Sequence, residues 1–263
     1  MKAPRTAGDF CAAAAVNSID ILNSCLLRSP DIASGVLPLK TYEGYRTAAS
    51  ALNAGLDESS APIIIFVHQD VYLPKSWLTR LAEQIDLVEQ TSPDWSVMGM
   101  LGRKVTGEIA GRVWSSGIGR EIGRPNVPLP AEVVTLDELV LILRRDSGLR
   151  FDEGLPGFHL YGADIICQGR TRQMPAFAID APVIHHDKPV GPLHGSYATA
   201  YKYMQRKWWD SLPVKNLICD ITRSPVPLWR AQIRRYRALW RTGVERPSFD
   251  AVALAKSLNY ENT

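Results

Sequence analysis

The sequence has few cysteines, and they carry neither a metal-binding nor a disulfide pattern. Only four occur among 263 residues: Cys11, Cys25, Cys167 and Cys219. No two form a CxxC pair, and none has the short Cys/His spacing of a zinc module. A disulfide framework needs a higher cysteine density in a chain of this length. We therefore expect four buried, reduced thiols.

Long apolar runs are also absent. No run approaches the roughly 20 residues needed to cross a bilayer. The stretch 10–16 is short, follows Asp9 and leads to no cleavage site, which excludes a signal peptide. We therefore expect a cytoplasmic protein. The hydrophobic fraction is 46% and the charged fraction 22%, which excludes the disordered and fibrous classes.

The positive charge is unevenly distributed. The net charge is +3, but seven arginines and one glutamate lie between Arg223 and Arg246, a local balance of +6 that leaves −3 for the rest. The chain length allows one domain, or one domain plus an extension. We therefore divide the chain into a body, residues 8–222, and a basic extension, residues 223–263.

Strand and helix patterns alternate in the first hundred residues. The clearest strand is 61–67, a continuous apolar run typical of the centre of a parallel sheet. Further strands are predicted at 10–16, 36–41 and 95–101, and helices at 19–27, 46–56 and from Pro74 onward. The second half is less regular, with loops or short hairpins at 102–132, a strand within 133–143, a helix reached through the loop after Phe158, and a final strand at 176–185. We expect an α/β fold with a mixed sheet.

Polar residues follow the clearest strand directly, as His68, Gln69 and Asp70. Ligands of α/β proteins bind in the crevice beyond the carboxyl ends of such strands. A carboxylate there suits Mg²⁺ or Mn²⁺ on a diphosphate. The alternative is that Asp70 caps the following turn.

Two later segments also carry groups suited to chemistry. Asp164 follows a glycine-bracketed loop, at the expected start of a helix, where it is either a general base or a first-turn acid favoured by the helix dipole. His185 and His186 follow an apolar strand and point to opposite sides. Either could complete a metal site, or both could be structural.

Taken in order, these segments resemble the family 2-like glycosyltransferases of the GT-A fold, and within them the group named after the streptomycin-biosynthesis protein StrF. The resemblance runs over roughly residues 10–210. It rests on the ordered segments Ala48–Asn53, His68–Asp70, Leu136–Val140 with Arg144 and Arg145, Phe151–Glu153, Tyr161–Asp164, Val183–His186 and Arg206–Trp208.

The resemblance implies a mixed central sheet flanked by helices, a nucleotide-diphosphate sugar donor and a divalent cation, Mn²⁺ or Mg²⁺. Asp70 matches the last acid of the family's DxD-type metal motif, with His68 in place of the first acid. His185 and His186 match the position of a further metal ligand. Asp164 matches the base that deprotonates the acceptor hydroxyl, so inversion of configuration is expected.

Donor and acceptor residues follow from the same resemblance. The implied nucleotide-binding positions are Asn17, Ser18, Tyr42, Glu43, Asn53, His68 and Gln69. A glycan or lipid-linked acceptor is expected at His159, Tyr161 and Trp208. Because one carboxylate of the metal motif is missing, a catalytically silent domain that binds nucleotide or glycan is the second hypothesis. A nucleotidyltransferase ranks last, because no glycine-rich basic loop follows the first strand.

The basic extension contains a predicted amphipathic helix, residues 228–241, preceded by Pro225 and Pro227. One stripe consists of Trp229, Ile233, Tyr236 and Trp240, and a neighbouring stripe of Arg230, Arg234, Arg237 and Arg241. This pattern suits peripheral contact with an anionic membrane at its inner face, or an acidic acceptor. The alternative is that the aromatic stripe packs on the body. We expect no nucleic-acid partner, because no nucleic-acid-binding module is present.

Overall fold

The computed structural model describes residues 5–123, 126–188, 191, 193–242, 248 and 250–261, without the side chains of 239–242. The strands are β1 (Phe10–Val16), β2 (Leu39–Glu43), β3 (Ile63–Val67), β4 (Val71–Tyr72), β5 (Val97–Gly99), β6 (Leu101–Arg103), β7 (Ile109–Ser115), β8 (Arg120–Gly123), β9 (Ala131–Val133), β10 (Thr135–Leu136), β11 (Val140–Arg144), β12 (Ala176–Ala178) and β13 (Val183–His185). The α-helices are α1 (Ile19–Ser24), α2 (Pro30–Ala33), α3 (Ala48–Glu58), α4 (Trp77–Glu89), α5 (Tyr161–Thr171), α6 (Ser196–Lys207), α7 (Val226–Thr242) and α8 (Ala251–Ser257). Short 3₁₀ turns are η1 (Ala7–Asp9), η2 (Leu26–Arg28), η3 (Arg145–Ser147) and η4 (Trp209–Ser211).

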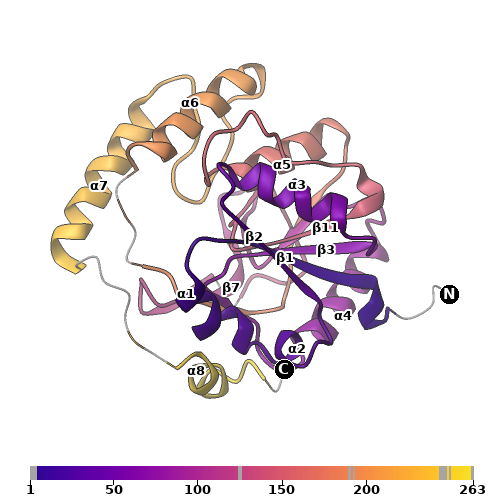
Figure 1. The fold of residues 1–263 in the computed structure, drawn as a ribbon. Helices are drawn as coiled ribbons and strands as arrows, with labels where there is room; N and C mark the ends of the chain where they lie inside the picture. The colour runs from indigo at the N-terminus through magenta and orange to yellow at the C-terminus, as the bar shows by residue number, and fades with distance from the viewer. Residues whose placement is uncertain are drawn as a thin grey trace.

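A seven-stranded mixed sheet forms the centre of the molecule, with strand order β2-β1-β3-β11-β5-β12-β9 (Figure 1). Strands β1, β2 and β3 are parallel, and β11 runs antiparallel to β3 and β5. Val140, which begins β11, therefore lies beside Val67, which ends β3. The predicted α/β fold with a mixed sheet is confirmed.

Helices cover both faces of this sheet because the apolar residues of its strands alternate between two cores. Ile64 and Phe66 of β3 pack in one core with α3, α5, α6 and the start of α7. Ile63, Ile65 and Val67 pack in the other with α1, α2 and α4. Figure 1 shows α3 and α5 on one side of the sheet and α4 on the other. The continuous apolar run predicted this two-sided burial.

A second, six-stranded sheet is a feature that the sequence did not predict. Its order is β10-β6-β7-β13-β4, with β8 paired to β7. Its antiparallel pairs β6–β7 and β7–β8 lie largely in the segment 102–132, where loops or short hairpins were expected, so the hairpins are confirmed but their joining into a sheet was not predicted. The single strand predicted at 176–185 is wrong, because the segment forms β12 in the first sheet and β13 in the second. Pairing with distant segments organises these short strands.

Two smaller predictions have definite outcomes. Pro74 does not open α4, which begins at Trp77 after Ser76 in a left-handed conformation with φ of 62°. All four cysteines lie within the described residues, are buried and form no disulfide, as expected.

The extension packs against the body at two places. Leu228 and Ala231 of α7 are buried in the first core. Ala251 and Ala255 of α8 pack with Tyr72 of the second sheet. Trp229 and Tyr236, however, are 60% and 57% exposed, so these aromatic residues of the predicted stripe do not pack on the body. The side chains of Trp240 and Arg241 lie outside the described residues.

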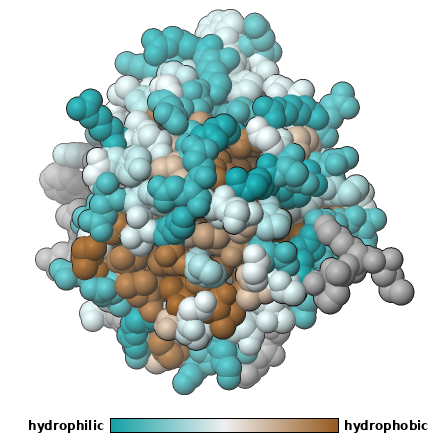
Figure 2. Space-filling view, turned by 45° about the vertical axis from the view of Figure 1, so that its right-hand side comes forward, coloured by the Kyte–Doolittle hydropathy of each residue, from teal (hydrophilic) through white to brown (hydrophobic). Residues whose placement is uncertain are grey.

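The surface combines polar and apolar regions. Figure 2 shows one face on which hydrophobic side chains gather in a patch in the lower part of the view, bordered by hydrophilic ones. Among the helices of the described residues, none has the length and apolarity needed to cross a membrane.

Candidate functional site

The candidate site begins where β1 and β3 end, at the same edge of the sheet. Both strands are parallel, so the residues that follow them are neighbours. The Oε1 atom of Gln69 accepts hydrogen bonds of 3.0 Å from the backbone N–H groups of Asn17 and Ser18. Gln69 Nε2 donates to Asn17 Oδ1. These bonds hold the two strand ends together and fix the direction of the chain beyond β3.

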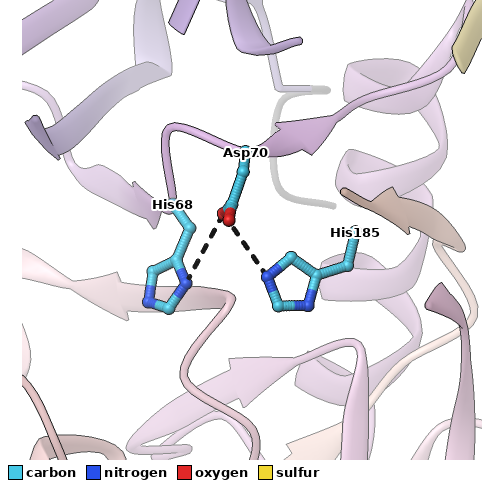
Figure 3. A group of neighbouring side chains, drawn as sticks. All are labelled: His68, Asp70 and His185. Carbon is cyan, nitrogen blue, oxygen red and sulfur yellow. Dashed lines mark ion pairs between the residues drawn. The ribbon is translucent and has the colours of Figure 1, made fainter. Parts of the chain in front are cut away.

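Three side chains at this edge form a group with metal-ligand chemistry: His68, Asp70 and His185. One ligand atom from each lies within 4.8 Å of the others. Asp70 Oδ1 is 3.4 Å from His185 Nε2 and 4.0 Å from His68 Nδ1. Figure 3 shows both rings directed toward the Asp70 carboxylate. His68 and His185 reach it from opposite sides because His185 ends β13 of the second sheet.

Burial and the neighbouring charges shift the pKa values of the two histidines in this group. Burial lowers the pKa of His68. Burial also acts to lower the pKa of His185, but the hydrogen bond and negative charge of Asp70 outweigh it and raise that pKa to about 9. Without a cation, His185 and Asp70 therefore form an ion pair near neutral pH.

A tyrosine orients one of the rings. His68 Nε2 lies 2.7 Å from the hydroxyl of Tyr161, which begins α5. Because Nε2 is engaged in this contact, Nδ1 is the ring nitrogen that faces Asp70. Such outer contacts fix the orientation of metal-binding imidazoles.

A cavity of about 690 Å³ lies beside this group. Its lining includes Asn17, Ser18, His68, Gln69, Asp70, Glu138, Phe158 and Tyr161. A second cavity, of about 460 Å³, shares Asn17, Ser18 and Phe158 with the first and adds Tyr42 and Glu43. The structure therefore brings six of the seven expected nucleotide-binding residues to two adjoining cavities.

Asn53 is the seventh, and it lies elsewhere. Its side chain is buried, accepts a hydrogen bond of 3.0 Å from the backbone N–H of Phe151, and donates to Phe151 O and Glu153, each at 2.9 Å. Neither cavity includes it in its lining. These contacts give Asn53 a structural position between α3 and the segment before α5.

His186 is not part of the three-residue group. Its backbone N–H donates a 2.7 Å hydrogen bond to the carbonyl of Asp70. The group that satisfies the metal-ligand distances within the described part of the chain contains His68 in its place. His68 was predicted to bind the nucleotide and was not predicted as a metal ligand.

Asp164 lies in the interior of the protein. It is 1% exposed, and its carboxylate accepts bonds from Lys207 Nζ at 2.8 Å, Trp208 Nε1 at 2.7 Å and Gln168 Nε2 at 2.9 Å. Neither cavity has Asp164 in its lining. Trp208, expected at the acceptor, is thus bound to Asp164 instead of facing the first cavity.

Of the other expected acceptor residues, Tyr161 lines the first cavity and His159 does not. The His159 ring packs against Tyr197 of α6, with ring centres 5.5 Å apart. Burial lowers the pKa of His159.

Glu138 is a cavity residue that the sequence analysis missed. It lies between β10 and β11 and accepts a 2.9 Å hydrogen bond from the backbone N–H of Gly162. Burial raises its pKa to about 8, against the opposing effect of that hydrogen bond. The available signal was a pair of acids, Asp137 and Glu138, directly before an apolar strand. This local pattern does not give the direction of the strand, which decides where Glu138 lies.

Comparison with known proteins found one partial sequence relative and several solved structures at low identity. No family model matches the sequence. A protein of Fuscovulum blasticum described as "ATP synthase subunits region ORF 6" is 31% identical over 132 residues, 48% of this chain and 52% of that protein. The chain therefore spans about half the length of this curated relative.

Several solved structures are similar to this chain at low identity. Residues 1–349 of S. aureus TarS have a TM-score of 0.49 and 14% identity, covering 89% of this chain and 72% of that one. The mannosyltransferase PcManGT of Pyrobaculum calidifontis, in complex with GDP-Man and Mn²⁺, has a TM-score of 0.47 and 11% identity, covering 95% and 79%. GalNAc-T7 with UDP, GalNAc and Mn²⁺ has a TM-score of 0.47 and 11% identity, covering 95% and 57%.

Proposed function

We propose that this chain is a family 2-like glycosyltransferase of the GT-A fold, in the StrF-like group, that transfers a sugar from a nucleotide-diphosphate donor to an acceptor hydroxyl with inversion. The observation that carries the proposal is the group of His68, Asp70 and His185 beside the first cavity. The location at the carboxyl ends of parallel strands, the predicted ligand crevice, supports it.

The three side chains fit a divalent cation. Two imidazoles and one carboxylate supply three ligand atoms that lie within 4.8 Å of one another, and Asp70 is only 9% exposed. A bound Mn²⁺ or Mg²⁺ would stabilise the negative charge that develops on a leaving diphosphate. The two imidazoles favour Mn²⁺, since Mg²⁺ prefers oxygen ligands.

The donor nucleotide would occupy the two adjoining cavities. The shared wall of Asn17 and Ser18 lies close to Asp70, where the diphosphate would be needed. Tyr42 and Glu43, in the second cavity, would then contact the base and ribose. The hydroxyl of Tyr42 donates a 3.1 Å hydrogen bond to Glu58, which fixes the Tyr42 ring near the end of β2.

The acceptor would approach past Tyr161, and we propose a glycan or lipid-linked hydroxyl compound. Asp164, the base implied by the resemblance, could reach that acceptor only if its bonds to Lys207 and Trp208 opened. His159 and Trp208 would support the site from outside the first cavity.

A silent nucleotide- or glycan-binding domain is the second candidate, favoured by one observation. His68 leaves the metal group with a single carboxylate. Such a domain would bind nucleoside diphosphate and Mn²⁺ without consuming a nucleotide sugar.

Incubation of the full chain with a panel of UDP- and GDP-sugars and Mn²⁺ tests the proposal, with release of nucleoside diphosphate as the readout. We expect release from at least one sugar, its loss in Asp70→Asn and its loss after EDTA treatment. UDP or GDP binding without release from any sugar would favour the silent domain. Neither binding nor release would reject both functions.

A further inference from the structure

Glu138 is a second carboxylate in the wall of the first cavity, beside Asp70. It lines the first cavity together with Asp70 and Tyr161. It is held there because β11 runs antiparallel to β3, so the residues before β11 lie at the same edge as those after β3. A carboxylate therefore faces the donor cavity from a third element, separate from the metal group.

The start of α5 is shaped around this carboxylate. A Cβ atom added at Gly162 would lie 2.9 Å from Cγ of Glu138 and 3.6 Å from its Oε1. The missing side chain leaves room for Glu138, and the Gly162 N–H donates to it. Glu138 thus fills the volume above the first turn of α5 that a side chain at position 162 would take.

Asp164, in contrast, is fully engaged within the protein. Its three donors belong to α5 and to the end of α6, and its exposure is 1%. A group that accepts a proton from a substrate must come within hydrogen-bond reach of it. Glu138 lines the first cavity, where a substrate could come within this reach, whereas Asp164 is not among the residues that line it.

We infer that Glu138, not Asp164, accepts the proton of the acceptor hydroxyl, an inference that rests on the proposed function. In this step the acceptor O–H bond breaks and its proton moves to a Glu138 carboxylate oxygen. The acceptor oxygen forms a bond to the anomeric carbon. The bond from that carbon to the diphosphate oxygen breaks, and the nucleoside diphosphate leaves with the electron pair.

The electrostatic surroundings agree with this role. Burial raises the pKa of Glu138 to about 8, and the charge of Asp137 adds to the effect. A base whose pKa is near the working pH balances ionisation against proton affinity. The other titratable side chains that interact with it are Tyr161 from α5 and Tyr197 from α6. His68 and Asp70 line the same cavity.

The test compares full-length variants with a UDP- or GDP-sugar that the wild type consumes in the presence of Mn²⁺, with water or a simple alkyl glycoside as acceptor. Release of nucleoside diphosphate measures the reaction, and calorimetric binding of UDP or GDP with Mn²⁺ measures the donor site. We expect Glu138→Gln to lower release about 10²- to 10⁴-fold, the usual contribution of a general base, with nucleotide affinity changed less than threefold. Glu132→Gln, exposed on β9, is the matched control and should keep the wild-type rate.

A second pair of variants moves the carboxylate. Gly162→Asp, added to Glu138→Ala, places an acid in the volume that Glu138 vacates, and we expect at least a tenfold recovery over Glu138→Ala alone. Wild-type release by Glu138→Gln would overturn the inference, and so would equal loss of release and nucleotide binding, which would make Glu138 a donor-binding residue. A wild type that consumes no nucleotide sugar would instead reject the proposed function itself.

Discussion

Gln69 Oε1 lies 3.0 Å from the backbone nitrogen of Asn17, so the side chain after one central strand holds the backbone after its neighbour. The same oxygen also accepts the N–H of Ser18. Both residues line the cavities in which we place the donor. The shape of the donor site thus depends on a single, 8% exposed amide group.

We predict that Gln69→Leu weakens UDP or GDP binding about tenfold and destabilises the fold by about 1–3 kcal/mol, because two backbone donors lose their acceptor. Calorimetry with Mn²⁺ and urea denaturation measure the two effects. Gln90→Leu, exposed at the end of α4, is the control and should change neither. Unchanged nucleotide affinity in Gln69→Leu would show that the Gln69 hydrogen bonds do not contribute to the donor site.

We predict that Mn²⁺ binds more tightly than Mg²⁺, because two of the three grouped ligands are imidazoles. Asp70→Asn and His185→Ala should each weaken Mn²⁺ binding at least tenfold, as followed by the paramagnetic resonance of free Mn²⁺. His186→Ala should bind Mn²⁺ as the wild type does, with exposed His194→Ala as a control. Loss of Mn²⁺ binding in His186→Ala alone would restore the ligand set expected from the sequence.

We predict that Asp164→Asn acts mainly on stability. Its carboxylate receives a charged bond from Lys207 and a bond from Trp208 in the interior. Weakening these two bonds should lower the free energy of unfolding by about 2 kcal/mol. The loss is smaller than for a fully buried ion pair, because solvent reaches Lys207. Thermal and urea unfolding measure this loss, with exposed Asp210→Asn as control. Complete loss of sugar transfer in a folded Asp164→Asn protein would return the role of base to Asp164.

Glu138 should make stability fall with rising pH. Burial raises its folded-state pKa to about 8, whereas the unfolded chain has the ordinary value of 4.5. Between these values the folded state retains a proton that the unfolded state releases, so the contribution of Glu138 to stability is present at low pH and is lost as the pH rises. We predict that Glu138→Gln raises the melting temperature at pH 8 relative to wild type, and less at pH 5, in metal-free buffer. An equal effect at both values would argue against the raised pKa.

We propose that α7 binds an anionic membrane surface, because Trp229 and Tyr236 are exposed and Arg230, Arg234 and Arg237 are exposed beside them. Phosphatidylglycerol vesicles should sediment the protein at low salt. The double variant Trp229→Ala/Tyr236→Ala should lower the bound fraction severalfold, and phosphatidylcholine vesicles should bind little. Equal binding to both lipids, or none at low salt, would contradict the prediction.

The centre of the first sheet could be predicted because β1, β3 and β11 are largely apolar runs that are buried on both faces. The second sheet could not be predicted, since β6 and β7 contain glycine and arginine, and β7 pairs with β13, some seventy residues farther along the chain. Asp70 and His185 were predicted from their positions at strand ends. Glu138 was missed because its place depends on the direction of β11, and no local pattern encodes that direction.

The chain passes from the first sheet to the second at Asp70, between β3 and β4, and β4 pairs with the strand that carries His185. His68, Asp70 and His185 therefore lie at the boundary between the two sheets. A cation bound there would act as a cross-link between them, and mass action would raise the melting temperature with its concentration. Binding of a cation and the relative placement of the two sheets would then be one equilibrium.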